Sequence, residues 1–125
     1  MKPKVNVRIP RGYKPKQKEI DAAWILAQKH KTTVEMLRPS MRYKVKTPDF
    51  RINDLVYELK TPETSKGNKV LSDIMKASKQ ASNVIIDMRR TKIIEKRMVA
   101  LCRQALKTMK RLQSITLIVN KKKVL

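Results

Sequence analysis

The sequence is poor in the residues on which several classes of proteins depend. Cys102 is its one cysteine among 125 residues, which excludes a disulfide framework and a cysteine-rich zinc site. His30 is its one histidine, which excludes a two-histidine metal site. Aromatic residues make up only 4%, too few for a stacking platform that binds single-stranded nucleic acid. No apolar run reaches membrane-spanning length and no signal-peptide core opens the chain, so we expect a cytoplasmic protein with no membrane partner.

Positive charge, by contrast, is abundant. The 31 Lys and Arg against 10 Asp and Glu give a net charge of +21, which attracts polyanions in a salt-dependent way and makes nucleic acid the first expected partner. At 14.6 kDa and 41% apolar residues, the chain fits one domain with a core of its own. Residues 1–16 are rich in Lys and Arg, lack Asp and Glu, and include three prolines. We therefore expect them to form a flexible basic arm and residues 17–125 to form the folded domain. The arm is either a solubilising tail or linker, or a segment that contacts phosphates.

Apolar spacing predicts alternating helices and strands. The expected helices cover residues 17–29, 68–81 and 91–112, and the expected strands cover 33–37, 47–52, 55–60, 83–88 and 114–119. Residues 43–46 are expected to form a strand or the approach to one. The order α-β-β-β-α-β-α-β requires crossovers, so it predicts an α/β fold with helices packed on a mixed sheet. Trp24 and Cys102 are expected to be core residues.

One predicted hairpin gathers the residues with catalytic potential. Asn53 and Asp54 both tolerate positive φ, so they predict a two-residue turn that fixes the register of the flanking strands. That register places Asp49 opposite Glu58, and strand alternation places Lys60 on the same face as Glu58.

This arrangement predicts a metal site. Opposed residues put their Cβ atoms about 4.5–5.5 Å apart, and two carboxylates at that distance repel. A Mg²⁺ or Mn²⁺ ion would offset the repulsion, polarise a phosphate and lower the pKa of a bound water, while Lys60 would orient that water or stabilise charge on the phosphorane. The pattern therefore predicts phosphodiester hydrolysis. The other interpretation of Glu-x-Lys is an exposed strand that alternates acid and base for solubility.

The same residues carry a resemblance to a known superfamily. Pro48-Asp49, followed after eight residues by Glu58-Leu59-Lys60, resembles the PD-(D/E)xK nuclease signature. The resemblance implies that the Asp and Glu bind a divalent metal and that the Lys assists catalysis. It also implies a restriction-endonuclease-like α-β-β-β-α-β core, to which this chain adds a C-terminal helix and strand.

A narrower resemblance points to toxins. Residues 46–53, 57–62 and 79–86 resemble the C-terminal tRNA nuclease domain of contact-dependent growth-inhibition toxins and related domains of phage and mobile elements. One departure is Asp54, where the hairpin of this family leads us to expect Gly.

The resemblance also suggests supporting residues. Glu19 corresponds to a first-helix glutamate that reaches the metal, although a first-turn acid also compensates the helix dipole. Gln80 is a candidate to face the scissile phosphate or, more simply, an exposed polar residue at a helix end. Glu35 is a weaker candidate than Glu19, and His30 is expected to be an exposed helix cap.

These observations lead to one main hypothesis with alternatives. The main hypothesis is a toxin that acts in the target-cell cytoplasm as a Mg²⁺-dependent endonuclease on RNA, with tRNA favoured. Its immunity protein is expected to be acidic and to cover the face formed by Asp49, Glu58 and Lys60. The basic arm and the basic face of the 91–112 helix would hold the phosphates. The alternatives are a non-catalytic basic nucleic-acid-binding protein of ribosomal or nucleoid type, a DNA-cleaving member of the superfamily, and a metal-independent toxin ribonuclease.

Overall fold

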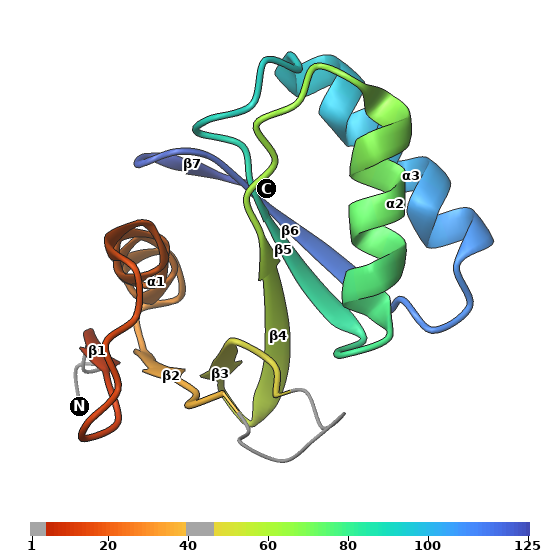
Figure 1. Ribbon diagram of the computed structural model, residues 1–125. Coiled ribbons are helices and arrows are strands. Elements are labelled where there is room, and N and C mark those ends of the chain that lie inside the picture. The colour runs from red at the N-terminus through yellow and green to blue at the C-terminus, as the bar shows by residue number, and fades with distance from the viewer. Residues whose placement is uncertain (1–4, 40–46) are drawn as a thin grey trace.

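The computed structural model describes residues 5–39 and 47–125, to which every structural statement below refers. Three helices and seven strands follow one another along the chain (Figure 1). Their bounds are β1 Asn6–Arg8, α1 Gln17–His30, β2 Thr33–Met36, β3 Phe50–Ile52, β4 Leu55–Lys60, α2 Gly67–Ser78, β5 Asn83–Asp87, α3 Glu95–Thr108, β6 Ser114–Asn120 and β7 Lys123–Val124. None of these helices is long and apolar enough to span a membrane.

The seven strands form one mixed sheet in which spatial order equals sequence order, from β1 to β7. The pairs β1–β2, β4–β5 and β5–β6 are parallel, whereas β2–β3, β3–β4 and β6–β7 are antiparallel. The α1 helix covers one face of the twisted sheet, and α2 and α3 cover the other (Figure 1). The predicted α/β fold with a mixed sheet is confirmed.

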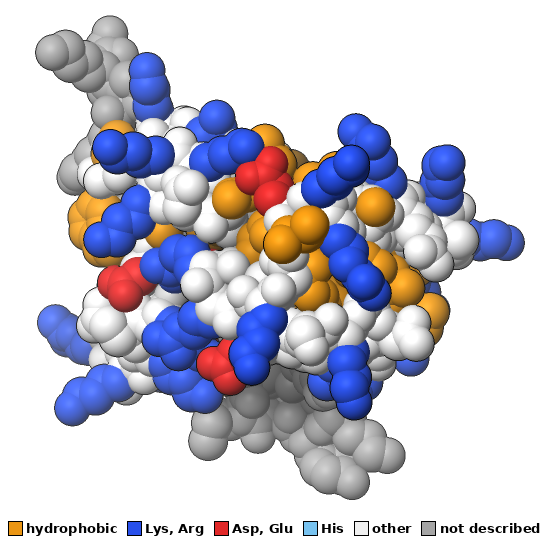
Figure 2. Space-filling view, turned by 90° about the horizontal axis from the view of Figure 1, so that it is seen from above, with side chains coloured by type: hydrophobic (Ala, Val, Ile, Leu, Met, Phe, Trp, Pro, Cys, Tyr) orange, Lys and Arg blue, Asp and Glu red, His pale blue; other side chains and the backbone are white. Residues whose placement is uncertain are grey.

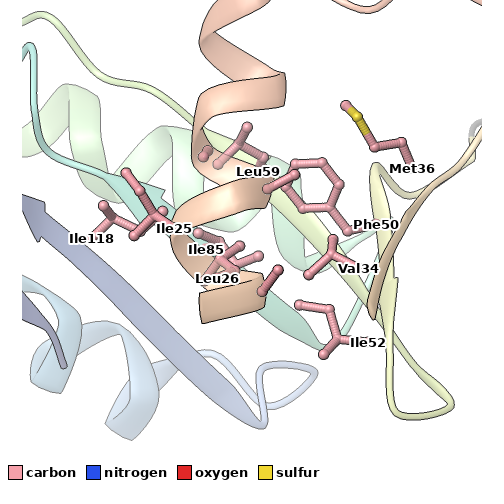
Figure 3. Close-up of a cluster of buried hydrophobic side chains, with 12 residues drawn as sticks. Ile25, Leu26, Val34, Met36, Phe50, Ile52, Leu59, Ile85 and Ile118 are labelled. Atoms are coloured by element: carbon pink, nitrogen blue, oxygen red, sulfur yellow. The ribbon is translucent and has the colours of Figure 1, made fainter. Parts of the chain in front are cut away.

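Each face of the sheet carries its own hydrophobic core. Leu26 of α1, Phe50 and Ile85 belong to the core on the α1 side (Figure 3). Val84 and Ile86, which flank Ile85 in β5, belong instead to the core beneath α2 and α3. All five residues of β5 are buried, as the apolar run at 83–88 predicts for a central strand.

The predicted elements agree with the observed ones except at some boundaries. The predicted helix 91–112 is shorter at both ends, because the Thr91 hydroxyl donates to the Thr64 carbonyl in a loop and Met109 leaves helical geometry at ψ 105°. The sequence did not predict β7. The expected strand at 43–46 lies outside the described residues.

Part of the expected basic arm belongs to the sheet. Asn6–Arg8 forms β1, which pairs in parallel with β2, and Val7 packs against the α1-side core. No sequence pattern indicated this strand, because only Val5, Val7 and Ile9 alternate there, between basic residues and prolines.

The two expected core residues have different outcomes. Cys102 is buried, as expected, and burial raises the pKa of its thiol to about 11. The prediction for Trp24 is wrong, because its side chain is 40% exposed. The buried stripe of α1 is centred on Ala22 and Leu26, which turns Trp24 toward the opposite side of the helix.

Candidate functional site

The hairpin between β3 and β4 has the predicted turn. Asn53 and Asp54 have φ values of +48° and +68°, as the two central residues of a type I′ turn require. The Thr32 hydroxyl donates to Asn53 Oδ1 at 3.2 Å and ties the turn to the end of α1. The ladder pairs Ile52 with Leu55, Arg51 with Val56 and Phe50 with Tyr57, which confirms the predicted register over these residues.

Asp49 lies just beyond this ladder and is held by three hydrogen bonds. Its N–H donates to the Tyr57 carbonyl and its carbonyl accepts from the Leu37 N–H, both at 2.9 Å. Its carboxylate Oδ2 accepts from the Leu59 N–H at 2.8 Å. The sequence predicted a regular pairing of Asp49 with Glu58, and this prediction is wrong. The N–H of Asp49 bonds to Tyr57, which is already the ladder partner of Phe50. The Asp49 carboxylate bonds to the β4 backbone at Leu59, the residue after Glu58.

Glu19 of α1 lies close enough to Asp49 for their charges to interact. Burial, first, and the negative charge of Asp49, second, raise the pKa of Glu19, while Lys16 and Lys18 act in the opposite direction. The same neighbourhood includes Tyr13, whose pKa is raised by burial and then by the charges of Glu19 and Asp49. No sequence pattern linked Tyr13 to these acids.

Glu58 and Lys60 face the other side of the sheet. In the parallel register, Glu58 pairs with Val84 and Lys60 with Ile86, and both partners belong to the core beneath α2 and α3. Paired residues in a sheet point to the same face, so Glu58 and Lys60 point away from α1. Glu58 is buried, with 6% of its surface exposed, and Lys60 is half-buried.

The predicted metal ligands thus reach the strand from two sides. Glu19 lies on the α1 side and Glu58 on the α2 side, while the Asp49 carboxylate is bonded to the backbone between Glu58 and Lys60. Within residues 5–39 and 47–125, no three His, Cys, Asp or Glu side chains are grouped as metal ligands. Burial first, and repulsion from Asp49 second, raise the pKa of Glu19, and a bound cation would relieve the repulsion. Carboxylate oxygens suit Mg²⁺, so the donor chemistry of Asp49 and Glu19 fits a divalent metal.

The remaining candidates lie elsewhere. Glu35 forms an ion pair with Arg51 at 3.9 Å. His30 is exposed at the end of α1, as expected. Gln80 follows α2 and is half-buried, and its backbone N–H donates to the Ala77 carbonyl at 2.9 Å. Its role at the phosphate stays a prediction.

The fold and sequence can be compared with known proteins. The structure is similar to a chain of the CdiA-CT/CdiI toxin and immunity complex from Burkholderia pseudomallei, with a TM-score of 0.73 over 96% of each chain. The two chains are 18% identical, so this likeness shows a shared fold. No curated protein matches the sequence. The profile of the family described as "Contact-dependent growth inhibition CdiA C-terminal domain" matches residues 46–124, which is more than half of the chain. This chain therefore belongs to the CdiA C-terminal domain family of contact-dependent growth inhibition.

Proposed function

We propose that this chain is a toxin domain that cleaves RNA, with tRNA the favoured substrate, as a metal-dependent endonuclease of the PD-(D/E)xK type. The observation that carries the proposal is the position of Asp49, which is anchored on the β4 backbone beside Glu58 and interacts with the charge of Glu19. Membership of the CdiA C-terminal family and a fold similar to that of a chain from a toxin and immunity complex support the proposed toxin role.

Each site residue has a role in the proposed reaction. Asp49, together with either Glu58 or Glu19, would hold a Mg²⁺ or Mn²⁺ ion, which when bound polarises a phosphate oxygen and lowers the pKa of a water. Because Glu58 and Glu19 lie on opposite faces, Asp49 is the carboxylate that can share a cation with either. Lys60 orients the attacking water or stabilises the charge that develops on phosphorus, and Gln80 faces the scissile phosphate. Water attacks phosphorus, the P–O bond to the leaving oxygen breaks, and the proton that the water loses ends on the leaving oxygen.

The basic surface supports binding of a nucleic-acid backbone. Figure 2 shows Lys and Arg side chains spread over one face of the molecule, with few acidic side chains among them. The exposed side of α3 adds Lys96, Arg97, Arg103 and Lys107. Contacts from such side chains to phosphates are independent of sequence and weaken with salt, so we expect this surface to hold RNA without reading its bases.

A cleavage assay tests the proposal. tRNA and plasmid DNA are each incubated with the protein in Mg²⁺ or in chelator, and wild type is compared with Asp49→Asn, Glu58→Gln, Glu19→Gln and Lys60→Ala. The matched control is Glu63→Gln, since Glu63 is an exposed acid paired with Arg90 at 3.8 Å. We expect tRNA cleavage in Mg²⁺ by wild type and by the control, and a loss of about 100-fold or more in Asp49→Asn, of the order that removal of a catalytic charge produces.

The other outcomes identify the alternatives. Cleavage that persists in chelator overturns the metal mechanism and favours a metal-independent ribonuclease, and cleavage of DNA alone overturns the RNA assignment. Binding without cleavage under all conditions favours the second candidate, a non-catalytic basic nucleic-acid-binding protein, which the opposite faces of Glu19 and Glu58 also favour. Comparison of Glu19→Gln with Glu58→Gln shows which of the two acids acts with Asp49.

We also propose an acidic immunity protein as partner, and the target-cell cytoplasm as the place of action. A net charge of +21 favours association with an acidic surface, and the structurally similar chain belongs to a toxin and immunity complex. The partner is expected to cover Asp49 and to block cleavage. A cognate immunity protein that binds without inhibiting cleavage would contradict this placement.

A further inference from the structure

A pocket lies where α1 meets the carboxyl ends of two parallel strands. Its volume is about 240 Å³, and its lining consists of Asp21, Trp24, Ile25 and Gln28 of α1, Arg89 from the loop after β5, and Lys121 after β6. Open α/β sheets bind ligands at the carboxyl ends of their strands. None of these residues belongs to the Asp49 site, and a volume below about 300 Å³ suits one small group rather than a drug-sized ligand.

Trp24 gives this pocket an aromatic surface. It is the one tryptophan of the chain and is 40% exposed, although burial of an indole would stabilise the core. An exposed indole beside converging polar groups is suited to stacking against a flat ligand. A single side chain does not make a stacking platform for a whole strand, but it can hold one base.

Arg89 gives the pocket a cation whose position is fixed before any ligand binds. Asp87, which is 1% exposed, accepts from Arg89 Nε at 2.9 Å and from Nη2 at 2.7 Å. Asp87 Oδ1 also accepts from the Arg89 N–H at 3.1 Å, and the Lys18 carbonyl accepts from Nη2 at 3.4 Å. An orientation held in this way lowers the entropy that is lost when a ligand binds.

The acid in the lining narrows the class of ligand. Asp21 accepts from Gln17 Nε2 at 2.8 Å, and its negative charge in the pocket opposes a bare phosphate. A nucleotide satisfies both kinds of group, because its base edge carries N–H donors for a carboxylate and its phosphate carries charge for a cation.

We propose that this pocket binds one unpaired nucleobase of the RNA substrate, stacked on Trp24, with its edge at Asp21 and Gln28 and its phosphate at Arg89 and Lys121. The inference rests on the proposed function for the identity of the substrate, but not on the metal or the cleavage step. It adds base recognition to a protein whose other surface contacts are independent of sequence.

The fluorescence of Trp24 tests the proposal directly, because no other tryptophan contributes to it. Nucleoside 5′-monophosphates and a single-stranded oligoribonucleotide are titrated in chelator, with ribose 5-phosphate and inorganic phosphate as probes that lack a base. We expect saturable quenching by the probes that carry a base and none by the two that lack one. Equal quenching by ribose 5-phosphate, or no quenching by any probe, overturns the proposal.

Variants separate this pocket from the rest of the surface. Binding of a labelled oligoribonucleotide, followed by anisotropy, is expected to weaken about five- to 150-fold in Trp24→Ala, the loss that removal of one base–aromatic stack produces. Trp24→Phe should retain most of the affinity. Leu106→Ala is the matched control, because Leu106 is a similarly exposed apolar residue (41%) on α3.

The result can be distinguished from a failure of the proposed function. If base-dependent quenching is seen but no nucleic acid is cleaved, the pocket is supported and the nuclease proposal fails. If tRNA is cleaved and Trp24→Ala binds RNA as wild type does, the nuclease proposal stands and the pocket proposal is overturned.

Discussion

The carboxylate of Asp49 accepts a hydrogen bond from the backbone N–H of Leu59, with 2.8 Å between Oδ2 and N. This bond fixes the end of β3 against β4 and places a negative charge between Glu58 and Lys60. Asp49 therefore has a structural contact in addition to its proposed role in metal binding, and a useful variant must change one without the other.

Asparagine and alanine at position 49 separate these two roles. Asp49→Asn keeps an oxygen that can accept from Leu59 N–H, so the free energy of unfolding should change by less than about 1 kcal/mol while cleavage is lost. Asp49→Ala leaves a partly buried N–H without its acceptor and should cost about 1–3 kcal/mol. Urea denaturation measures stability and tRNA cleavage measures activity. Full cleavage by Asp49→Asn would contradict the proposed role of the charge.

Glu19 is expected to make stability depend on pH. Because burial and Asp49 raise the pKa of Glu19 above its usual 4.5, the folded state binds more protons than the unfolded state above that pH. The free energy of unfolding therefore falls as pH rises from about 4.5 through the folded pKa. Glu19→Gln should remove this fall and be more stable than wild type at pH 7 in chelator.

The comparison is made by denaturant unfolding between pH 4 and pH 7, with Mg²⁺ added in a second series. A ligand that binds the folded state stabilises it, so Mg²⁺ should stabilise wild type more than Glu19→Gln. If Glu19→Gln is instead less stable at pH 7, the main role of Glu19 is compensation of the helix dipole.

The sequence predicted the hairpin well because its information is local. Asn53 and Asp54 specify the turn, and the turn specifies the pairs from Ile52–Leu55 to Phe50–Tyr57. Asp49 departs from this register because its N–H donates to Tyr57, which is already the ladder partner of Phe50, and its carboxylate accepts from Leu59 beyond the end of the ladder. No local pattern encodes that irregularity.

Features that depend on packing between distant segments could not be predicted. The hydrophobic pattern of α1 identified a helix but assigned Trp24 to the buried side, because small alanines on several sides of the helix leave its orientation open. Because the sequence did not show which face of the sheet α1 covers, it also did not show that Glu19 and Glu58 approach the sheet from opposite faces. Tyr13 lies near these acids in a segment far from Asp49 in sequence, two residues after Arg11, whose carbonyl accepts a hydrogen bond from Arg38.

The Asp87–Arg89 pair should be important for stability. Asp87 is almost fully buried, so Arg89→Ala leaves a charged carboxylate without its partner and should cost about 3–5 kcal/mol. Asp87→Asn with Arg89→Ala should lose less than the sum of the two single variants, since the double variant leaves no buried charge. A double-mutant cycle by urea denaturation measures this coupling. Additive losses would show that the pair contributes no coupling energy.

Replacing Asp54 with glycine should stabilise the hairpin. Asp54 has φ +68°, which a residue with a Cβ adopts at a cost and glycine adopts freely, and Asn-Gly is the preferred pair for a type I′ turn. The greater entropy of glycine in the unfolded chain opposes part of this stabilisation. The net increase in the free energy of unfolding should therefore be about 0.5–1 kcal/mol. Thermal and urea denaturation of Asp54→Gly measure it, with Asp54→Val as the comparison, since a β-branched residue is strained at positive φ. If Asp54→Val is as stable as Asp54→Gly, the turn does not hold the register that brings Asp49 to β4.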